Sequence, residues 1–469
     1  MEIKNINLGI FGHIDHGKTS LAKVLTEIPS TSSLDKLPES KKRGITIDIG
    51  FSSFNLKNYM ITLVDAPGHA DLIRAVVSAA DIIDLALLVV DAKEGPKTQT
   101  GEHLLILDYF KIPTIVLITK IDNATKEEIE RTENFIKVIL KSTENLKDSP
   151  ILKISAKENI GIDTLKEEII KKLDSLNIIR DTESYLKMPI DHAFPIKGIG
   201  TVLTGTVLKG KLKVGDELLL LPQNMDNIKV KSIQRFKKSV DEAYAGDRIG
   251  ISVQNVDYKQ IFRGCVLTNK DTNLKVVKDI VAKIKISNIF KYTLKPKMKV
   301  HLNVGMLIVP AEMVPFRRIN YDGGEENIIV KEIGRGDEVY CYFKLEEEVI
   351  GEVGENILIT RLDLPPTTLR ICGKGEILSF DNFKDLNIKR EVVKTGQIKI
   401  DKNRTVVVGL STSKEGGKKL IGKRIYVPER NIYGKIIDTF GTKGNLICEF
   451  EGPVSNKDIV QLKHLIRWG

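Results

Sequence analysis

Cysteine is scarce in this 469-residue chain, which has only Cys265, Cys341, Cys372 and Cys448. The four lie far apart, and neither a C-x-x-C pair nor a paired histidine spacing accompanies them. Zinc sites and disulfide frameworks depend on such short spacings. The pattern therefore indicates neither, and it predicts four reduced, mostly buried thiols.

Long apolar runs and low-complexity stretches are also missing. The richest apolar segment, IIDLALLVVDA, is interrupted by Asp84 well short of a membrane span, and the start, MEIKNINLGIFG, lacks the basic-then-apolar pattern of a secretory signal. No Pro-, Ser- or Gly-rich segment is long enough for a disordered linker. We therefore expect a cytoplasmic protein that does not enter a membrane and that folds throughout, as three or four domains.

Positive charge is concentrated near the C-terminus. The chain carries a net charge of +10, and residues 387–469 contain 17 Lys and Arg against 8 Asp and Glu, so that 17 − 8 = +9 lies in this stretch. A basic module of this kind favours contact with nucleic acid or the ribosome, and a merely solubilising surface is the alternative.

The first 180 residues contain a phosphate-binding pattern. NINLGIFGHIDHGKTSLAKVL reads as a strand, a glycine loop and a helix, with G-x-x-x-x-G-K-[ST] from Gly12 to Thr19. Small residues let backbone N–H groups approach the phosphates, Lys18 adds charge, and Thr19 offers a hydroxyl to Mg²⁺. The predicted phosphate-binding residues are Asp15, His16, Gly17, Lys18, Thr19 and Ser20.

Three later strand ends complete a guanine-nucleotide site. ITLVDAPGH places Asp65 to hold the metal through water, and the Gly68 backbone N–H can reach a γ-phosphate. TIVLITKID ends with Thr119, Lys120 and Asp122, and ILKISAKE ends with Ser155, Ala156 and Lys157. The Asp122 carboxylate suits the paired N–H donors of guanine, the Lys120 stem covers the base, and the backbone of residues 155–157 meets the guanine carbonyl. Loops at the carboxyl ends of parallel strands are where α/β sheets bind ligands.

GHIDHGKT, RGITIDIGF and DAPGH resemble the phosphate loop and the two switches of the translational GTPases. The resemblance implies that Thr46 reports the γ-phosphate through Mg²⁺ and that His69 orients the attacking water. It also implies that Ile14 and Ile45 form an apolar gate, which keeps His69 away until the ribosome is engaged. The alternative for His69 is that it caps the helix ADLIRAVVSAA.

The catalytic residues are then predicted to be His69, Lys18 and Asp65, with Thr19 and Thr46 on Mg²⁺. No arginine in these motifs is an obvious finger, so intrinsic GTP hydrolysis is expected to be slow and activation external. The sequence departs from the family at Thr119, where relatives usually have Asn. That exchange puts in question the contact which this residue makes with neighbouring loops.

From about residue 180 the pattern changes to short strands with Gly and Asp turns, which is typical of a small β-barrel. G-T-V-x-x-G-x-V followed by KVGD resembles the second domain of elongation factor Tu, and KVHLNVGMLIVPAEMVPFR and DLPPTTLRICGKGEIL resemble its third. In that family the second domain holds the amino acid esterified to tRNA. By this resemblance, PIDHAFPI and YAGDRIG place Asp191, His192 and Arg248 on the pocket lining.

Arg248 replaces the Asn of elongation factor Tu, and a buried guanidinium is costly without an anion. A selenol is mostly ionised at pH 7, whereas a thiol, with a pKa of about 8.5, is mostly neutral. We therefore expect Arg248 and His192 to receive a selenolate while Asp191 orients them, which would reject serine on the same tRNA. The alternative is that Arg248 is a rim residue paired with Asp191 or Asp247.

About 80 residues follow the third barrel, and RTVVVGL, KRIYVPE, NIYGKIIDTF and GNLICEFEG read as strands of a fourth, mostly β domain. A short helix is expected through NKDIVQLKHLI. A compact fourth domain resembles the archaeal and eukaryotic type of selenocysteine-specific elongation factor. Its target is left open among the mRNA selenocysteine insertion element, an adaptor protein, the long arm of the tRNA and the ribosome.

The predicted architecture is an α/β P-loop GTPase domain (1–180), two small β-barrels (181–272 with the aminoacyl pocket, 273–386 with tRNA contacts) and a basic β domain (387–469). The predicted function is GTP-dependent delivery of selenocysteinyl-tRNA to the ribosome for UGA recoding, with GTP or GDP and Mg²⁺ bound. The alternatives are a general elongation factor, a tRNA-binding initiation-factor gamma subunit and a regulatory G protein that binds no tRNA. A monomer is the default expectation.

Overall fold

The computed structural model describes residues 4–26, 50–65, 82–236, 238–254, 256–321, 324–365, 367–401 and 404–468. The chain forms two compact units. The first comprises Met1–Pro315 and Glu332–Asp381, and the second comprises Phe316–Lys331 and Asn382–Gly469. The predicted division into four domains at residues 180, 272 and 386 stays a prediction.

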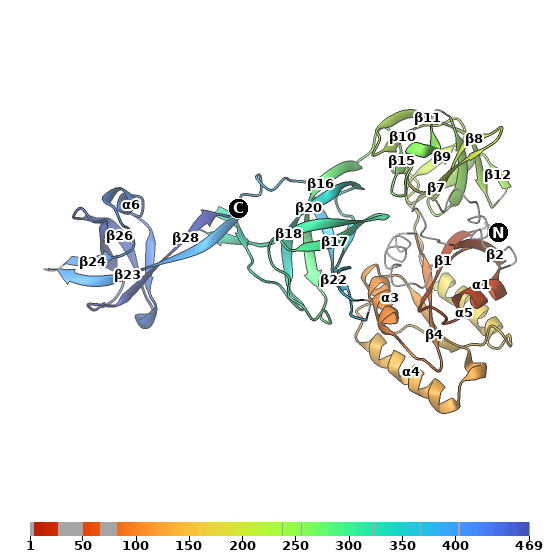
Figure 1. Cartoon of the computed structure of the whole chain (residues 1–469), viewed down its shortest axis with the longest axis horizontal. Helices are drawn as coiled ribbons and strands as arrows, with labels where there is room; N and C mark the ends of the chain where they lie inside the picture. Colours follow the sequence, from red (N-terminus) through yellow and green to blue (C-terminus); the bar gives the residue numbers. More distant parts are fainter. Residues whose placement is uncertain are drawn as a thin grey trace. The chain divides into compact units, whose positions relative to one another are not determined.

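The N-terminal part of the first unit is a six-stranded sheet in the order β2-β3-β1-β4-β5-β6. Figure 1 labels β1, β2 and β4 of this sheet together with the helices α1, α3, α4 and α5. All its neighbouring strands are parallel except β2 and β3. The strands are β1 (Lys4–Gly12), β2 (Gly50–Leu56), β3 (Tyr59–Asp65), β4 (Leu85–Asp91), β5 (Thr114–Thr119) and β6 (Ile151–Lys153). The helices are α1 (Lys18–Leu25), α3 (Thr98–Tyr109), α4 (Lys126–Lys141) and α5 (Ile162–Ser175), with a 3₁₀ turn η3 (Ile121–Asn123).

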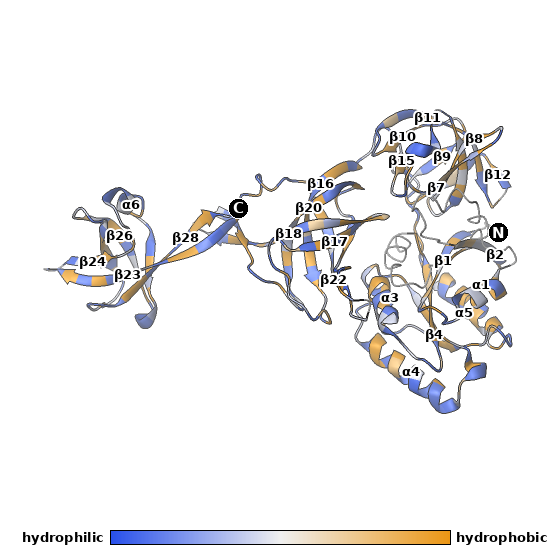
Figure 2. Ribbon diagram, viewed as in Figure 1, coloured by the Kyte–Doolittle hydropathy of each residue, from blue (hydrophilic) through white to orange (hydrophobic). Residues whose placement is uncertain are grey.

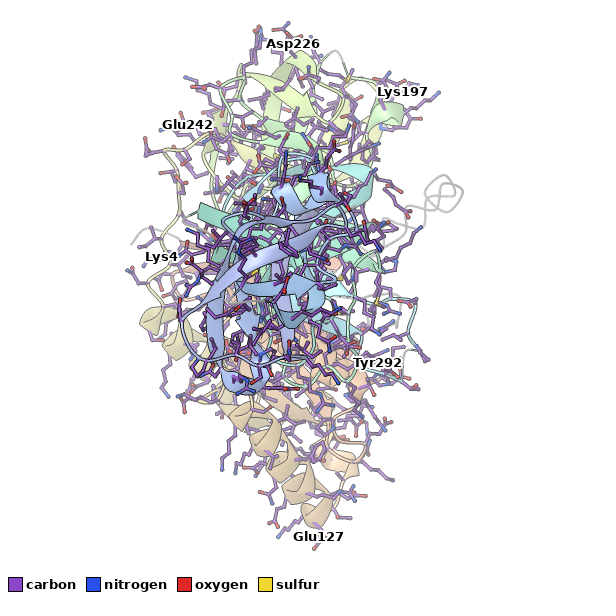
Figure 3. The ribbon with its side chains drawn as sticks, turned by 90° about the vertical axis from the view of Figure 1, so that its left-hand side faces the viewer. Lys4, Glu127, Lys197, Asp226, Glu242 and Tyr292 are labelled. Atoms are coloured by element: carbon purple, nitrogen blue, oxygen red, sulfur yellow. The ribbon has the colours of Figure 1, made fainter. Side chains whose placement is uncertain are left out.

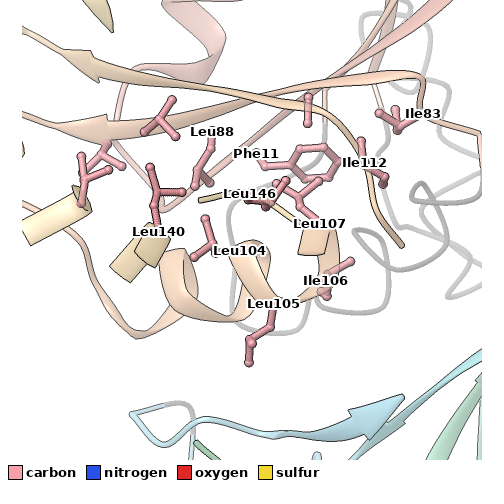
Figure 4. Close-up of a cluster of buried hydrophobic side chains, with 14 of the residues drawn as sticks. Phe11, Ile83, Leu88, Leu104, Leu105, Ile106, Leu107, Ile112, Leu140 and Leu146 are labelled. Atoms are coloured by element: carbon pink, nitrogen blue, oxygen red, sulfur yellow. The ribbon is translucent and has the colours of Figure 1, made fainter. Parts of the chain in front are cut away.

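β4 and β5 are buried along their whole length. Both faces of this sheet are therefore covered by other parts of the domain. On one face Phe11 packs with Leu88 and with leucines of α3 and α4, such as Leu107 and Leu140 (Figure 4). On the other face, residues of α1 and α5 pack against the sheet. Polar and apolar residues alternate in bands along α4 (Figure 2), as expected of a helix that covers a sheet with one side. The predicted α/β nucleotide-binding fold is confirmed.

The next part of the first unit is a closed β-barrel. Its ring runs β10-β15-β7-β8-β14-β11 and closes through pairing of β10 with β11. Lys197 marks the tip of the β7–β8 hairpin in Figure 3. The strands are β7 (Lys187–Ile196), β8 (Gly200–Thr206), β9 (Lys211–Lys213), β10 (Glu217–Leu221), β11 (Met225–Arg235), β12 (Lys238–Val240), β13 (Glu242–Tyr244), β14 (Arg248–Val253) and β15 (Val266–Thr268), with the 3₁₀ turn η4 (Tyr258–Gln260).

A second ring follows in the order β17-β21-β22-β16-β20-β18 and closes through pairing of β17 with β18. Its strands are β16 (Lys275–Ile286), β17 (Lys299–Val304), β18 (Leu307–Tyr321), β20 (Glu338–Gly351), β21 (Asn356–Thr360) and β22 (Ile371–Ser379). The predicted pair of small barrels after the GTPase domain is confirmed.

The second unit is also built of strands. Its ring runs β23-β24-β27-β26-β25-β28 and closes through pairing of β23 with β28, while the end of β18 pairs with β19. Its elements are β19 (Gly324–Ile329), β23 (Lys389–Asp401), β24 (Arg404–Val408), α6 (Lys414–Lys418), β25 (Arg424–Val427), η5 (Pro428–Arg430), β26 (Ile432–Phe440), β27 (Asn445–Phe450) and β28 (Ile459–Arg467).

The helix expected through NKDIVQLKHLI is wrong, because these residues enter strand β28. Val460 and Leu462 are fully buried, whereas Lys463 is exposed and Gln461 is half-buried. This alternation has the period of two of a strand that is buried on one face. The prediction of a mostly β fourth domain is confirmed.

The four cysteines are free and buried, as expected. Burial raises the pKa of the Cys448 thiol to about 12 and raises that of Cys341 well above its usual value. These thiols are therefore protonated and unreactive at neutral pH. Within the described part of the chain, no helix combines the length and the apolar character needed to cross a bilayer.

Candidate functional site

The predicted nucleotide motifs gather at one edge of the N-terminal sheet. β1, β4, β5 and β6 are parallel neighbours, with Gly12 beside Val89 and Asp91 beside Thr119. Their carboxyl ends therefore face the same way, as does that of β3, which is parallel to β1. The predicted loops follow β1, β3, β5 and β6. This edge is where doubly wound sheets bind nucleotides.

The loop from Gly12 to Gly17 ends at the start of α1. Gly17 adopts a φ of 93°, and α1 has neither a side-chain cap nor an acidic residue in its first turn. Its first backbone N–H groups can therefore meet an anion, which the helix dipole also favours. The buried Lys18 Nζ donates to the carbonyls of Gly12 and His13, each at 2.8 Å, which holds the cation over the loop. These residues fit a nucleotide phosphate.

The predicted magnesium residues lie partly outside the described residues. Thr19 is exposed in the first turn of α1, and the backbone of Asp65 ends β3 beside Ile10 of β1. A hydroxyl at this position, with a carboxylate from the next strand, is the oxygen donor type that Mg²⁺ prefers. Ile14 is half-buried in the loop. The other residues predicted for the switches and the gate, namely Ile45, Thr46, Gly68 and His69, and the side chain of Asp65, are outside the described part of the chain.

The guanine-binding residues occupy the turns after β5 and β6. Lys120 Nζ lies 2.9 Å from an oxygen of Asp91. Burial would raise the pKa of Asp91, but the Glu94 N–H and Lys120 outweigh it and lower the pKa. Asp122 is exposed, and no hydrogen bond or ion pair to it occurs among the described residues. Ser155 is buried, and its hydroxyl accepts from the Glu158 N–H at 3.1 Å, which shapes the turn through Ala156 and Lys157.

Thr119 contacts the phosphate loop directly. Its hydroxyl lies 2.6 Å from the carbonyl oxygen of His16 and 3.2 Å from that of Val90. The side chain is 103 residues from His16 in sequence and is buried with it. The hydroxyl therefore provides a tether between the base-binding strand and the phosphate loop. This is the contact that was in question because Thr119 stands where relatives usually have Asn.

Replacing Thr119 by Val is expected to weaken GDP binding about tenfold, because an unsatisfied buried carbonyl costs roughly 1–3 kcal/mol and here it distorts the phosphate loop. Fluorescence titration with a labelled GDP measures the change. Thr132→Val is the matched control. The buried Thr132 hydroxyl donates to the Ala92 carbonyl in a hydrogen bond of 2.8 Å, and this bond does not involve the phosphate loop. If both variants bind GDP equally well, the tether has no role in nucleotide binding.

A buried histidine supports the same loop from α3. The Gly12 N–H donates to His103 Nδ1 at 3.0 Å, and the imidazole packs edge-on to Phe11. Burial, together with the charge of Lys18, lowers the pKa of His103 to about 3. Burial also lowers the pKa of His16 to about 4. Both rings are therefore neutral at pH 7, and His103 accepts through Nδ1.

The stability of the N-terminal domain is expected to fall on acidification. A histidine whose pKa is about 3 when folded and about 6.5 when unfolded takes up its proton preferentially in the unfolded state between these values. Its contribution is complete above about pH 6.5 and shrinks by up to about 1.4 kcal/mol per pH unit below that. Urea unfolding between pH 7 and pH 5 should therefore show a shallower pH dependence in His103→Gln than in the parent. An unchanged slope would contradict the assignment.

The second predicted site lies on the first barrel, where β7 has a bulge. β7 pairs with β8 through Ile190 opposite Gly205 and His192 opposite Thr204, so Asp191 is the extra residue. Bulges re-aim side chains. The Asp191 carboxylate accepts from Arg248 Nη1 at 2.5 Å, from Thr204 Oγ1 at 2.5 Å, and lies 2.9 Å from His192 Nδ1. The structure thus brings the three predicted pocket residues together.

Charge is concentrated in this cluster. The side chains of Asp191 and Arg248 are 8% and 11% exposed, and that of His192 is 37% exposed. Burial would raise the pKa of Asp191, but the Arg248 guanidinium and the hydrogen bonds from His192 and Arg248 hold it well below its usual range. Arg248 is paired with Asp191, as the alternative expected, and its place in the pocket or at its rim stays a prediction.

Two residues of this site were missed by the sequence reasoning. Phe51 of β2 presents its ring to the Arg248 guanidinium, 3.2 Å from the ring centroid. Arg263, on the loop before β15, has two buried nitrogens, Nε and Nη2, that find no hydrogen-bond partner among the residues that the structure describes. Burial lowers the pKa of Arg263, and the charge of Asp191 partly opposes that. No local pattern marks either residue, because each joins the site only through tertiary folding.

Comparisons with known proteins match three parts of the chain to described domains. Residues 3–175 match the Elongation factor Tu GTP binding domain, residues 200–268 match Elongation factor Tu domain 2, and residues 274–381 match the Archaeal selenocysteine-specific elongation factor, domain III.

Full-length relatives extend the match. The selenocysteine-specific elongation factor of Methanocaldococcus jannaschii is 60% identical over 469 residues, which is all of this chain and 99% of that protein. The mouse selenocysteine-specific elongation factor is 37% identical over 325 residues, 64% of this chain and 55% of that protein. The crystal structure of translation elongation factor SelB from Methanococcus maripaludis in complex with a GTP analogue is 64% identical, covers all of both chains and superposes with a TM-score of 0.86. The chain therefore belongs to the selenocysteine-specific elongation factors, a family of translational GTPases.

Proposed function

We propose that this protein binds selenocysteinyl-tRNA in its GTP-bound form, delivers it to the ribosome for UGA recoding and hydrolyses GTP when the ribosome is engaged. The observation that carries the proposal is the cluster of Asp191, His192 and Arg248 at the β7 bulge. An arginine 11% exposed in a barrel wall is what an anionic amino-acid side chain requires.

Selection against serine follows from charge rather than size. Asp191 uses two of the five N–H donors of Arg248, at 2.5 and 3.3 Å, and Phe51 covers one face of the guanidinium. A selenolate takes remaining donors and gains a charge-assisted hydrogen bond in a dry environment. A serine hydroxyl carries no charge and leaves donors of Arg248 that Asp191 does not use without an anionic acceptor, and rejection on this basis can reach roughly 10⁴-fold.

A second cation, Arg263, can bind another anionic group of the cargo. Two buried nitrogens of Arg263 have no partner within the described part of the chain, and the Asp191 charge acts on its guanidinium. An unpaired buried donor is costly, and a phosphate or carboxylate repays that cost. We assign Arg263 to an anion of the charged tRNA other than the selenolate.

GTP chemistry is assigned to the loops at the sheet edge. Lys18 would contact the phosphates, and Thr19, Thr46 and Asp65 would hold Mg²⁺. When bound, the metal would supply positive charge to the phosphates. His69 orients the attacking water, and Ile14 and Ile45 form the gate that restrains it. Asp122, Lys120 and residues 155–157 select guanine.

Direct contacts join the nucleotide domain to the cargo site. Asn7 Nδ2 in β1 donates to the Gly246 carbonyl at 3.1 Å, two residues before Arg248. Asn5 Nδ2, in the same strand, donates to the carboxylate of Asp247, the residue before Arg248. Phe51 is the last residue of the predicted first-switch motif RGITIDIGF and contacts Arg248 itself. A change in the switch can therefore reach the cargo pocket through packed groups.

The rivals make different predictions. A regulatory G protein that binds no tRNA predicts no affinity for tRNA in either nucleotide state. A general elongation factor predicts equal affinity for different aminoacyl groups. Among the described residues no group of three or more metal-ligating side chains occurs.

Filter binding of selenocysteinyl-tRNA with GDP and with a non-hydrolysable GTP analogue tests the carrier function. We expect tight binding only with the analogue, and a linear fall of log affinity with log salt, because phosphate contacts release counterions. Binding that ignores the nucleotide, or that is flat with salt, would overturn the proposal.

A further inference from the structure

The strand that leads to the phosphate loop also holds the turn that precedes Arg248. At the start of β1, Asn5 donates through Nδ2 to the carboxylate of Asp247, and Asn7 donates through Nδ2 to the Gly246 carbonyl at 3.1 Å. Asp247 and Asn7 are 3% and 1% exposed, and polar groups as buried as these need their partners. The residue directly before Arg248 is therefore fixed by side chains of the nucleotide domain.

Arg180, in the segment after α5, completes this contact. It donates to both carboxylate oxygens of Asp84 at 2.8 and 2.6 Å and to the Asn5 carbonyl at 3.2 Å. Gly246 has a φ of 96°, and a Cβ there would lie 2.5 Å from Arg180 Nε. A side chain at this position would therefore both strain the backbone and displace Arg180. The contact, called the turn clamp below, consists of Asn5, Asn7, Arg180, Gly246 and Asp247.

Arg248 depends on both domains for its surroundings. Its guanidinium pairs with Asp191 of the same barrel. Its flat face lies 3.2 Å from the ring centroid of Phe51, which belongs to β2 of the nucleotide domain. A cation–π contact has no fixed hydrogen-bond geometry, so its distance depends on how the two domains are held together. The turn clamp joins the same two domains one residue before Arg248.

We propose that Asn5 and Asp247 are positioning residues for cargo selection. Through the turn clamp, the nucleotide domain holds the Arg248 guanidinium against Phe51, where its side chain is only 11% exposed. When the clamp is released, the turn moves away from β1 and water replaces the ring. A hydrated guanidinium loses the dry environment that strengthens a charge-assisted hydrogen bond, so its preference for an anion over a neutral group falls. This inference rests on the proposed function, in which Arg248 receives the selenolate.

Contacts within the barrel do not have this effect. Asp247 also accepts from the Tyr244 N–H and from Arg235 Nη1, each at 3.1 Å. These two bonds close the turn itself and move together with the barrel. Losing the Arg235 contact therefore leaves the distance between Arg248 and the nucleotide domain unchanged, whereas losing the Asn5 contact alters it.

The test replaces Asn5 by Asp in the full chain, so that a second carboxylate faces Asp247 and the two repel each other. We expect the preference for selenocysteinyl-tRNA over seryl-tRNA, titrated with a non-hydrolysable GTP analogue, to fall about tenfold. The loss should lie in the selenocysteine form, because the serine side chain carries no charge for the cation to bind. GDP affinity should stay unchanged, because Asn5 and Gly12 lie at opposite ends of β1, about 23 Å apart.

A rescue variant combines Asn5→Asp with Asp247→Asn. The amide introduced in the turn can donate to the carboxylate introduced in β1 and keeps its oxygen for the Tyr244 N–H and Arg235. This pair should restore most of the preference for selenocysteine. Arg235→Gln, which removes a partner of the same carboxylate inside the barrel, should retain the preference.

The outcomes separate this inference from the carrier function. Equal affinities of the parent for the two charged forms would overturn the proposed function and the inference with it. A preference in the parent that Asn5→Asp keeps would overturn the inference alone. A loss that is equal for both charged forms, or that the rescue variant does not restore, would show that Asn5 and Asp247 only stabilise the fold, and it would also overturn the inference.

Discussion

In Arg248→Asn protein, the preference for selenocysteinyl-tRNA over seryl-tRNA should fall by a factor of about 100 or more. The substitution removes the cation that receives the selenolate, and losing a buried charge partner costs roughly 2–5 kcal/mol. It also leaves Asp191, 8% exposed, with Thr204 and His192 but no full positive charge. Affinity for the selenocysteine form should therefore drop while affinity for the serine form changes little.

The measurement is a pair of equilibrium titrations with the same tRNA in its two charged forms and a non-hydrolysable GTP analogue. Arg235→Gln is the matched control, because Arg235 is an arginine of the same barrel that pairs with Asp247 at 3.1 Å. It should retain the preference. Arg248→Asn protein that discriminates as well as the control would show that Arg248 is structural and that the cargo's charge is read elsewhere.

Glu102→Gln should destabilise the first unit by about 3–5 kcal/mol, because it leaves the Arg370 guanidinium buried without its carboxylate. Glu102 of α3 is fully buried and Arg370, just before β22, is 4% exposed. Glu102 accepts from the Arg370 N–H, Nε and Nη2 at 3.0, 3.1 and 3.0 Å. The pair joins the nucleotide domain to the second barrel, and His103, the next residue in α3, supports the phosphate loop.

Urea unfolding of the first transition measures this loss. Glu133→Gln is the control, since its lysine partners Lys137 and Lys153 are about half exposed and such pairs contribute at most about 1 kcal/mol. The double variant Glu102→Leu with Arg370→Met should recover most of the stability, because an apolar pair replaces a buried ionic one at little cost. If Glu102→Gln unfolds like the control, the buried pair contributes nothing to the docking.

The nucleotide loops were predictable because each is contiguous in sequence and follows a strand. GHIDHGKT, DAPGH, TKID and SAKE need only the order of strands to meet at one sheet edge, and β1, β3, β5 and β6, which they follow, are parallel strands of one sheet. The tether from Thr119 was not predictable, since it depends on a carbonyl 103 residues away. The hydroxyl of Thr119 and the amide of the Asn usual in relatives can both donate a hydrogen bond to a backbone carbonyl. Only the folded structure shows which carbonyl lies within reach.

The cargo pocket was predictable only in part. Asp191 and His192 stand out because they interrupt an apolar strand, and Arg248 stands out against the pattern of elongation factor Tu. Phe51 and Arg263 carry no such signal, because they reach the pocket from another domain and from a loop. The prediction of a helix near the C-terminus was wrong for a related reason. IVQLKHLI is so short that its apolar residues fit both the helical period of 3.6 and the strand period of 2. Its pairing with β23, which closes the last barrel, makes it a strand.

The most direct test of the account is the ratio of affinities of the unmodified protein for one tRNA charged with selenocysteine and then with serine, with a non-hydrolysable GTP analogue bound. The account predicts a preference for selenocysteine of at least about 1,000-fold at pH 7. The preference should shrink when the pH is lowered far enough to protonate the selenolate. Equal affinities for the two charged forms would contradict the assignment of Asp191, His192 and Arg248 as a selenolate pocket.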